Sequence, residues 1–160
     1  MKLFEQYQFQ PFVKETLQKL NFQSPTEIQK SVIPLVYKHR DVIGISQTGT
    51  GKTHAFLIPI MDMIETSADC VQAVITAPTR ELAQQIYDQA KVFTNYNKNL
   101  RVSLIIGGKD KQKTISKLNV QPHLVIGTPG RIKDLSLEEQ ALKITTADIF
   151  VIDEADMTLE

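Results

Sequence analysis

The chain has 160 residues, and its 18 Lys and Arg residues are balanced by 18 Asp and Glu residues, so the formal net charge is zero. This length suits one domain, and the hydrophobic fraction of 42% is typical of a soluble globular protein with its own core. The charge balance excludes a basic domain that binds nucleic acid by bulk charge, so any such binding must depend on local groups. The single cysteine, Cys70, excludes an internal disulfide and a cysteine-based zinc site.

The first residues lack the apolar core of a signal peptide. The most apolar stretch, residues 56–64, contains Pro59 and Asp62 and is too short to cross a membrane. A single cysteine also fits a reducing compartment. These features predict a cytoplasmic protein that does not enter a membrane.

Two helices are predicted at the start of the chain. Residues 10–20 place their apolar side chains near helical spacing, namely Phe12, Val13, Leu17 and Leu20. A second helix is expected after Pro25, with Thr26 as its N-cap and with Pro34 at a kink or near its end. Its apolar face is expected to consist of Ile28, Val32, Leu35 and Val36.

Beyond residue 40, short apolar runs alternate with longer helical stretches. The runs are residues 41–45, 71–76, 102–106, 124–126 and 149–152, and the helical stretches lie near residues 53–65, 80–95, 109–118 and 130–135. Runs that are rich in Val and Ile and not interrupted by charge are typical of strands buried on both faces, and the alternation predicts an α/β fold with a parallel sheet. Ligands of such sheets bind beyond the carboxyl ends of the strands, so the loop after each run is a candidate site.

Residues 46–53 read SQTGTGKT and lie between an apolar run and an apolar helix. Gly49 and Gly51 let the backbone curl so that successive N–H groups point at phosphate oxygens. A helix that starts near Lys52 adds the positive end of its dipole. Lys52 would then reach the terminal phosphates, and the Thr53 hydroxyl would bind Mg²⁺. The alternative is a glycine-rich turn with a solvated lysine.

The last apolar run ends in an acidic pair, Asp153 and Glu154. One carboxylate at such a position can hold the Mg²⁺ that bridges the phosphates, and the next can orient or activate water. The alternative is an aspartate that caps a helix, followed by a solvated glutamate. The ordered combination of a phosphate loop and an acidic strand end favours hydrolysis of a nucleoside triphosphate.

From Phe4 to Asp156, the chain resembles the N-terminal RecA-like domain of DEAD-box ATP-dependent RNA helicases. Residues 153–156 spell the family name, residues 21–29 (NFQSPTEIQ) resemble its Q motif, and SQTGTGKT resembles its phosphate loop. The resemblance implies a three-layer RecA-like P-loop NTPase fold with a mainly parallel central sheet. It implies a partial ATP-binding domain over residues 1–160 (Q motif 4–29, phosphate loop 46–53, DEAD motif 153–156), without the C-terminal helicase domain.

The resemblance implies ATP and Mg²⁺ as cofactors. Gln29 would read the adenine edge, because an amide both donates and accepts hydrogen bonds, and Phe4 would pack on the base. Phe22 and Pro25 would line the pocket, although plain core packing is the alternative for both phenylalanines. The phosphate loop is expected to contact the nucleotide through Ser46, Gln47, Thr48, Gly49, Thr50, Gly51, Lys52 and Thr53.

Catalytic roles follow from the same resemblance. Lys52 would hold the phosphates, Thr53 and Asp153 would hold Mg²⁺, the latter through water, and Glu154 would be the general base toward the attacking water. Asp156 would be structural and tie its loop to neighbouring motifs. The arginine fingers that stabilise the transition state come from the second domain in this family.

Three features depart from the family pattern. Asn21 replaces the usual glycine, Ser46 replaces the usual alanine, and the chain stops at Glu160, before the Ser-Ala-Thr motif. The strand with that motif normally lies between the phosphate-loop strand and the DEAD strand. Without it, these two strands are expected to pair directly, to leave a gap or to accept a strand from another chain. We expect that residues 1–160 alone neither unwind RNA nor hydrolyse ATP well.

Further segments resemble the RNA-contacting motifs of the family, and their candidate residues are Pro78, Thr79, Arg80, Gly107, Gly108, Thr128, Pro129, Gly130 and Arg131. Backbone N–H groups, hydroxyls and arginines suit the backbone of a single RNA strand, without sequence specificity. Turn and helix-cap chemistry is the alternative. The nearby lysines can face nucleic acid or simply solvent, and they are Lys109, Lys111, Lys113 and Lys117.

The function implied is that of an ATP-dependent RNA helicase. Its ATP-binding domain would bind ATP–Mg²⁺ and single-stranded RNA, and would unwind short duplexes when joined to a second RecA-like domain. One alternative is a nucleotide- and RNA-binding module without turnover. Another is a P-loop motor that acts on DNA, against which Gln29 and the DEAD sequence argue.

Overall fold

Residues 3–40 and 51–153 are described by the computed structural model, and they divide into two units. The N-terminal unit contains the chain up to Ile64 together with Val92–Lys98, and the sheet unit contains Glu65–Lys91 and the chain from Asn99 onwards. Within the described residues, no helix has the length and the apolar character needed to span a membrane.

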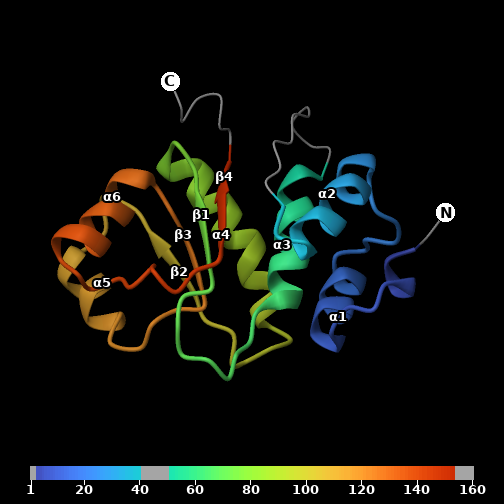
Figure 1. The fold of residues 1–160 in the computed structure, drawn as a ribbon, viewed down its shortest axis with the longest axis horizontal. Coiled ribbons are helices and arrows are strands. Elements are labelled where there is room, and N and C mark those ends of the chain that lie inside the picture. Colours follow the sequence, from blue (N-terminus) through green and yellow to red (C-terminus); the bar gives the residue numbers. More distant parts are fainter. Residues whose placement is uncertain (1–2, 41–50, 154–160) are drawn as a thin grey trace. The chain divides into compact units, whose positions relative to one another are not determined.

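Helices form the N-terminal unit (Figure 1), and they are η1 (Phe4–Gln6), α1 (Pro11–Lys19), α2 (Glu27–Tyr37) and α3 (Lys52–Met63). Helix α1 starts with Pro11 at its first position, where the missing N–H of proline costs no bond. Phe12, Val13 and Leu17 are buried, as their spacing predicted. Asn21 follows this helix with a φ of +60°, and asparagine tolerates this left-handed conformation better than most residues. The turn therefore keeps a geometry for which glycine is the usual choice.

Helix α2 starts at the predicted N-cap. The Thr26 hydroxyl accepts a hydrogen bond from the Gln29 N–H at 3.4 Å, and Gln29 Oε1 accepts one from the Thr26 N–H at 2.9 Å. The predicted apolar face was partly wrong, because the helix buries Val32 and Ile33 together with Gln29, whereas Leu35 is 36% exposed. The polar Gln29 side chain can be buried because it binds backbone groups. The side of α2 that carries Gln29 therefore faces the interior.

Asp62 in α3 joins the ends of three helices. Its carboxylate accepts hydrogen bonds from the Tyr37 hydroxyl at 2.5 Å and from the Gln10 N–H at 2.7 Å. Gln10 caps α1, and Tyr37 is the last residue of α2, in which Pro34 lies near the end as predicted. Burial and then the Asp62 carboxylate raise the pKa of Tyr37, so its hydroxyl stays a donor.

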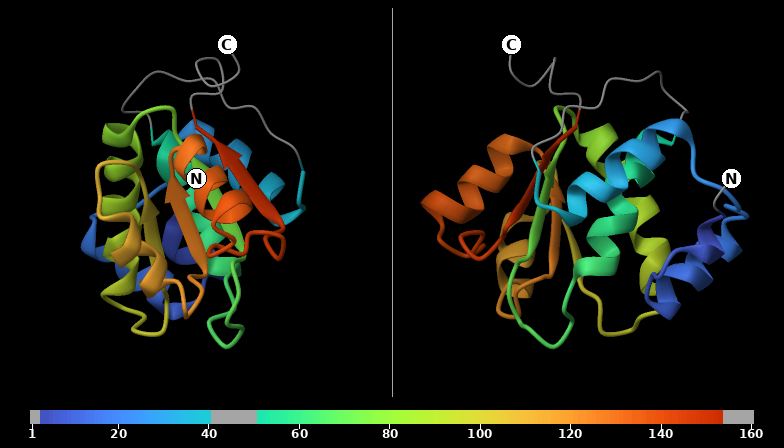
Figure 2. Two further views of the ribbon diagram at one scale, coloured as in Figure 1. Left: turned by 90° about the vertical axis from the view of Figure 1, so that its left-hand side faces the viewer. Right: turned by 45° about the vertical axis from the view of Figure 1, so that its right-hand side comes forward.

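Parallel strands and their crossover helices form the sheet unit. In chain order they are β1 (Ala73–Thr76), α4 (Arg80–Thr94), β2 (Val102–Ile105), α5 (Lys111–Lys117), β3 (Leu124–Gly127), α6 (Pro129–Lys133), the short π-helical turn η2 (Asp134–Glu138) and β4 (Ile149–Ile152). The last residues of α4 belong to the N-terminal unit. The described sheet has the order β2-β3-β1-β4, and every pair is parallel, as the alternation of runs predicted. The strands lie side by side in Figure 1 and Figure 2.

One face of this sheet packs on the segments that follow β2 and β3. Val74, Ile105 and Val125 from three strands form one buried cluster with Leu118, Ile132, Leu135 and Leu142. Leu118 ends α5, Ile132 lies in α6 and Leu135 in η2. This packing holds the loops at the carboxyl ends of the strands in place. The predicted strand at residues 41–45 lies outside the described residues.

Strand β4 differs from the expectation that it is buried on both faces. Phe150 is 59% exposed and Ile152 is 48% exposed, whereas β3 is buried at every position. Alternate residues of a strand point to opposite faces, so these two side chains share one exposed face. β4 pairs with β1 and ends the described strand order. The arrangement of the predicted strand at residues 41–45 relative to β4 stays a prediction.

Candidate functional site

Helix α3 begins at the candidate phosphate segment. Gly51 is its N-cap with a φ of +83°, and Lys52 and Thr53 are its first two residues, both partly exposed. The first N–H groups of a helix have no partner inside it and lie at the positive end of its dipole, so this turn suits phosphate oxygens. Outside the described residues lie the predicted site residues Ser46, Gln47, Thr48, Gly49, Thr50, Glu154 and Asp156.

The side chain of Gln29 connects α2 to the start of α3. Gln29 is 3% exposed; its Nε2 donates to the Gly51 carbonyl at 3.1 Å, while Oε1 accepts from the Thr26 N–H at 2.9 Å. A side-chain amide offers two donors and two acceptor lone pairs, so these two bonds leave one of each for another partner. The residue predicted to read adenine is thus joined directly to the segment predicted to hold phosphate.

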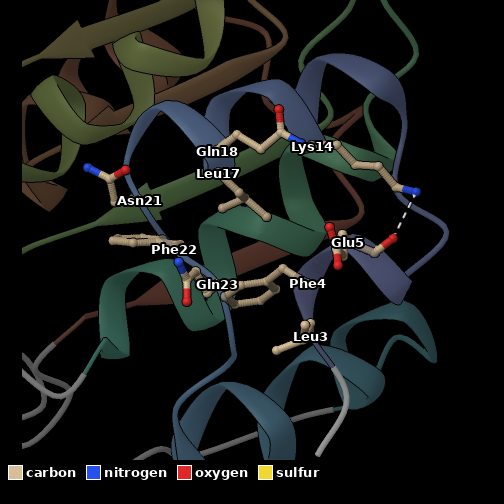
Figure 3. A pocket seen from close by; sticks show the side chains of 9 residues that line it. All are labelled: Leu3, Phe4, Glu5, Lys14, Leu17, Gln18, Asn21, Phe22 and Gln23. Atoms are coloured by element: carbon tan, nitrogen blue, oxygen red, sulfur yellow. Dashed lines mark hydrogen bonds between the residues drawn. The ribbon is translucent and has the colours of Figure 1, made fainter.

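A cavity of about 400 Å³ brings Phe4 and Phe22 together (Figure 3). Its lining residues are Leu3, Phe4, Glu5, Lys14, Leu17, Gln18, Asn21, Phe22 and Gln23. Four of these residues are apolar and five are polar or charged, so the lining is more polar than that of a typical small-molecule pocket. Phe4 is only 3% exposed, with its ring 5.9 Å from that of Tyr7, so core packing accounts for part of its role. Pro25 is buried, and neither Pro25 nor Gln29 lines this cavity.

His54 is a buried residue that the sequence analysis missed. It follows Thr53, is 8% exposed and lies edge-on to the ring of Phe22, with 4.9 Å between the ring centres. Within the described part of the chain, its Nε2 has no hydrogen-bond partner. Burial lowers the pKa of His54 to about 4, so the imidazole is neutral at pH 7 and packs as an aromatic ring. Its position directly after the phosphate segment was the only sequence signal.

We expect the free energy of unfolding to rise with pH between about 4 and 6.5, because His54 binds a proton in the unfolded chain but not in the folded one. The lowering from 6.5 to about 4 corresponds to roughly 3 kcal/mol at most. Urea unfolding over this pH range, with a His54→Phe variant as comparison, measures the effect. The variant should show the weaker pH dependence, and equal pH dependence in both proteins would contradict this expectation.

The carboxyl ends of the strands gather the remaining predicted segments. The register aligns Thr76 of β1 with Gly127 of β3 and Ile152 of β4. Asp153 follows β4, is 5% exposed and donates its N–H to the Thr76 carbonyl at 2.8 Å. Pro78 lies just beyond β1, and the other candidate RNA residues follow β1, β2 and β3. Parallel strands therefore place these segments at one edge of the sheet, where such folds bind ligands.

Two arginines lie against the glycine pair that follows β2. Arg80 Nη1 donates to the Gly107 carbonyl at 3.5 Å. A Cβ atom on Gly108, where φ is +81°, would lie 2.6 Å from Arg80 Nη1, and one on Gly107 would lie 3.6 Å from Arg131 Nη2. The structure thus brings three predicted RNA-contacting segments together. Two guanidinium groups beside accessible backbone suit the binding of phosphate oxygens.

Helix capping explains part of the chemistry of these segments. The Thr79 hydroxyl accepts from the Leu82 N–H at 3.1 Å and caps α4, which is the alternative role foreseen for this residue. Thr128 is the N-cap of α6, and Pro129 is its first residue. A Cβ atom on Gly130 would meet no atom within 4 Å, so the start of α6 is open at that point. The turn and cap roles therefore coexist with an accessible surface.

Asp134 is an acidic partner of Arg131 that the sequence analysis also missed. Its Oδ2 lies 3.5 Å from Arg131 Nη1 and 3.0 Å from Lys111 Nζ, and Lys111 Nζ lies 2.9 Å from Glu139 Oε1. An aspartate three residues after an arginine in a predicted helix is a signal for such a pair. The link to Lys111 requires the tertiary structure.

A family model described as DEAD/DEAH box helicase matches residues 26–160. The chain belongs to the DEAD/DEAH box helicase family. It is 54% identical over 158 residues to the DEAD-box ATP-dependent RNA helicase CshB of Listeria monocytogenes, and 54% identical over 159 residues to that of Bacillus subtilis. Each alignment covers 98% of this chain but 36% of the relative.

Solved structures resemble this chain over almost its whole length. A DEAD box protein from Methanococcus jannaschii matches with a TM-score of 0.88 and 33% identity, over 99% of this chain and 43% of that one. A Saccharomyces cerevisiae Dbp5 variant bound to RNA and ADP BeF3 matches with a TM-score of 0.87 and 29% identity, over 100% of this chain and 40% of that one. The α/β fold is therefore the RecA-like fold expected from the motifs.

Proposed function

We propose that this chain is the ATP-binding part of an ATP-dependent RNA helicase. It binds ATP–Mg²⁺ and the backbone of single-stranded RNA, and it unwinds short RNA duplexes when joined to a second RecA-like domain. The observation that carries this proposal is the common edge of the sheet, where Asp153 and three candidate RNA segments follow strands that end in register. The chain spans about 36% of the length of the CshB relatives, so the activity of a whole helicase is itself part of the proposal.

The nucleotide half of the proposal is supported by the start of α3. Lys52 is the first residue of α3, where its ammonium group and the first N–H groups of the helix can share the terminal phosphates. Gln29 is held against Gly51 and keeps one donor and one acceptor for an adenine edge. Phe4 and Phe22 line one cavity that Gln29 does not line, so the assignment of Phe4 to the base rests on the resemblance alone. Selectivity for ATP over GTP is assigned to Gln29.

Mg²⁺ fits the oxygen donors that the chain offers. This ion prefers hard oxygen ligands and usually keeps several waters while it binds one or two protein groups and the substrate phosphates. Thr53 supplies a hydroxyl in the first turn of α3, and Asp153 supplies a carboxylate at the end of β4. The bound ion would neutralise charge on the phosphates. Glu154 is assigned the role of general base, and Asp156 a structural role.

The RNA half of the proposal is supported by the glycine pair and its two arginines. Arg80 and Arg131 can each form charge-assisted hydrogen bonds to a phosphate, and the absence of side chains on Gly107 and Gly108 lets both guanidinium groups lie close to this backbone. Contacts of this kind do not distinguish bases, so binding should be independent of sequence. Because the net charge of the chain is zero, RNA binding must depend on these local groups rather than on bulk charge.

Lys52→Ala tests the nucleotide half. A charge-assisted hydrogen bond contributes about 1.5–3 kcal/mol, so we expect the Kd for ATP–Mg²⁺ to rise at least about tenfold. Isothermal titration calorimetry measures the Kd, and Lys38→Ala, which removes an exposed lysine at the end of α2, is the matched control. Unchanged ATP affinity in Lys52→Ala would refute the assignment.

An ATPase assay of the 160-residue chain, with and without single-stranded RNA, separates turnover from binding alone. The arginine fingers are assigned to the second domain, so we expect weak turnover by this chain and stronger turnover by a protein in which it is joined to a second RecA-like domain. ATP binding without turnover in both proteins would favour a nucleotide- and RNA-binding module instead. Competition between RNA and DNA strands of one sequence tests the preference for RNA.

A further inference from the structure

We propose that Lys111 is a positioning residue for RNA binding, which acts through Asp134 to hold the Arg131 guanidinium beside Gly107. This inference rests on the proposed RNA contact of Arg131. It gives Lys111 a different role from that of a lysine that faces the nucleic acid.

Four charged side chains form a continuous chain of ion pairs in the sheet unit. Arg131 Nη1 lies 3.5 Å from Asp134 Oδ2, Lys111 Nζ lies 3.2 Å from Asp134 Oδ1 and 3.0 Å from Oδ2, and Lys111 Nζ also lies 2.9 Å from Glu139 Oε1. Lys111 thus holds both oxygens of the Asp134 carboxylate. The order of contacts is Arg131, Asp134, Lys111 and Glu139.

The polypeptide places each of these residues where it can join the glycine pair to α6. Lys111 is the first residue of α5, three positions after Gly108. Asp134 begins η2, directly after α6, so its carboxylate lies one turn beyond Arg131. The ion pairs therefore connect the segment that follows β2 with the segment that follows β3. Each of these two segments carries predicted RNA-contacting residues.

The exposure of the side chains is consistent with a fixed geometry. Side chains of Lys111, Arg131 and Asp134 are 33%, 24% and 22% exposed, which is low for charged groups beside a helix start. Lys111 lowers the pKa of Asp134, and Glu139 and then Asp134 raise the pKa of Lys111. Both groups of the Lys111–Asp134 pair are therefore charged at neutral pH.

The donors that remain determine which residue binds phosphate. An ammonium group has three N–H donors, and Lys111 directs its own at two carboxylates. A guanidinium group has five, and Arg131 gives one side to Asp134 while its Nη2 lies beside Gly107. Asp134 thus orients Arg131, which keeps N–H donors for a phosphate, whereas the N–H donors of Lys111 are already directed at two carboxylates. The network contains two positive and two negative side chains, so its net charge is zero. Its effect on RNA binding should therefore come from the orientation of Arg131 rather than from added positive charge.

A double-mutant cycle with Lys111→Met and Arg131→Met tests this role. The measurement is the Kd for a fluorescently labelled oligouridylate at fixed low salt, by anisotropy, for the native chain, both single variants and the double variant. We expect Lys111→Met to weaken binding roughly threefold or more, and to have no further effect once Arg131 is gone. Lys111→Arg, which can still pair with Asp134, should restore native affinity.

Lys143→Met is the matched control, because it removes the same charge from an exposed position of the same unit. Its effect on RNA affinity should be smaller than that of Lys111→Met. None of the lysine variants should lower the unfolding temperature much, since ion pairs that are still partly open to solvent stabilise by about 1 kcal/mol or less. Equal effects of Lys111→Met and Lys143→Met, or an undiminished effect in the Arg131→Met background, would overturn the positioning role. No RNA binding by the native chain would overturn the proposed RNA contact as well.

Discussion

Gly51→Ala is expected to lower the ATP affinity about tenfold or more and to destabilise the N-terminal unit. Gly51 has a φ of +83°, which costs an alanine about 1–2 kcal/mol. A Cβ atom at this position would also lie 2.5 Å from Gln29 Nε2 and 3.1 Å from the Thr26 hydroxyl. Gln29 must then leave the Gly51 carbonyl, and the start of α3 must shift. One substitution thereby disturbs the residue assigned to adenine and the turn assigned to phosphate.

Calorimetric titration with ATP–Mg²⁺ and urea unfolding measure the two parts of this effect. Gly130→Ala is the control for stability, because a Cβ atom there meets nothing within 4 Å and the residue lies inside α6, where alanine is the better helix former. It should leave the chain as stable as before or slightly more stable. Native ATP affinity and native stability in Gly51→Ala would show that the left-handed turn does not support the nucleotide site.

Ile126→Ala should reduce the free energy of unfolding by about 2–5 kcal/mol, because it leaves a cavity in a tightly packed interior. Ile126 is fully buried in β3, which lies between β2 and β1 in the sheet. The loops after these three strands carry the candidate RNA residues. A large loss of stability would therefore reduce RNA binding at physiological temperature through unfolding, although Ile126 does not reach the surface.

Urea unfolding at 25 °C measures this loss, and Ile126→Val should give a smaller loss of about 0.5–1.5 kcal/mol. Val120→Ala is the matched control, because Val120 is 56% exposed and its truncation should change stability by less than about 0.5 kcal/mol. If Ile126→Ala and Val120→Ala had equal effects, β3 would not be the buried strand that the structure describes.

Most of the described secondary structure could be predicted from local pattern. Runs of Val and Ile without charge could only be strands or buried helical segments, and their length and alternation with amphipathic stretches favoured strands in a parallel sheet. β4 shows the limit of this reasoning. A run of four apolar residues looks the same whether both faces are covered or one face is open, and Phe150 and Ile152 prove to be exposed.

The candidate site could be predicted only as a set of segments. Glycine positions, the Thr26 cap and the acidic end of the last run are local signals, because each depends on the backbone conformation of a few residues. Gln29 was recognised by resemblance, but its bond to Gly51 spans two helices. His54 and Asp134 were missed, since burial and ion pairing depend on neighbours that are distant in the sequence.

The sequence by itself determined the order of the described strands and longer helices along the chain, the start of α2 after Thr26 and the membership of the family, because these properties follow from residue types at short spacing. Only the tertiary structure decided which side of α2 is buried, that Arg80 and Arg131 meet at one glycine pair, and that Lys111 is engaged by Asp134 and Glu139. The physical reason is that contacts between side chains depend on how elements pack, and many packings are compatible with one local pattern.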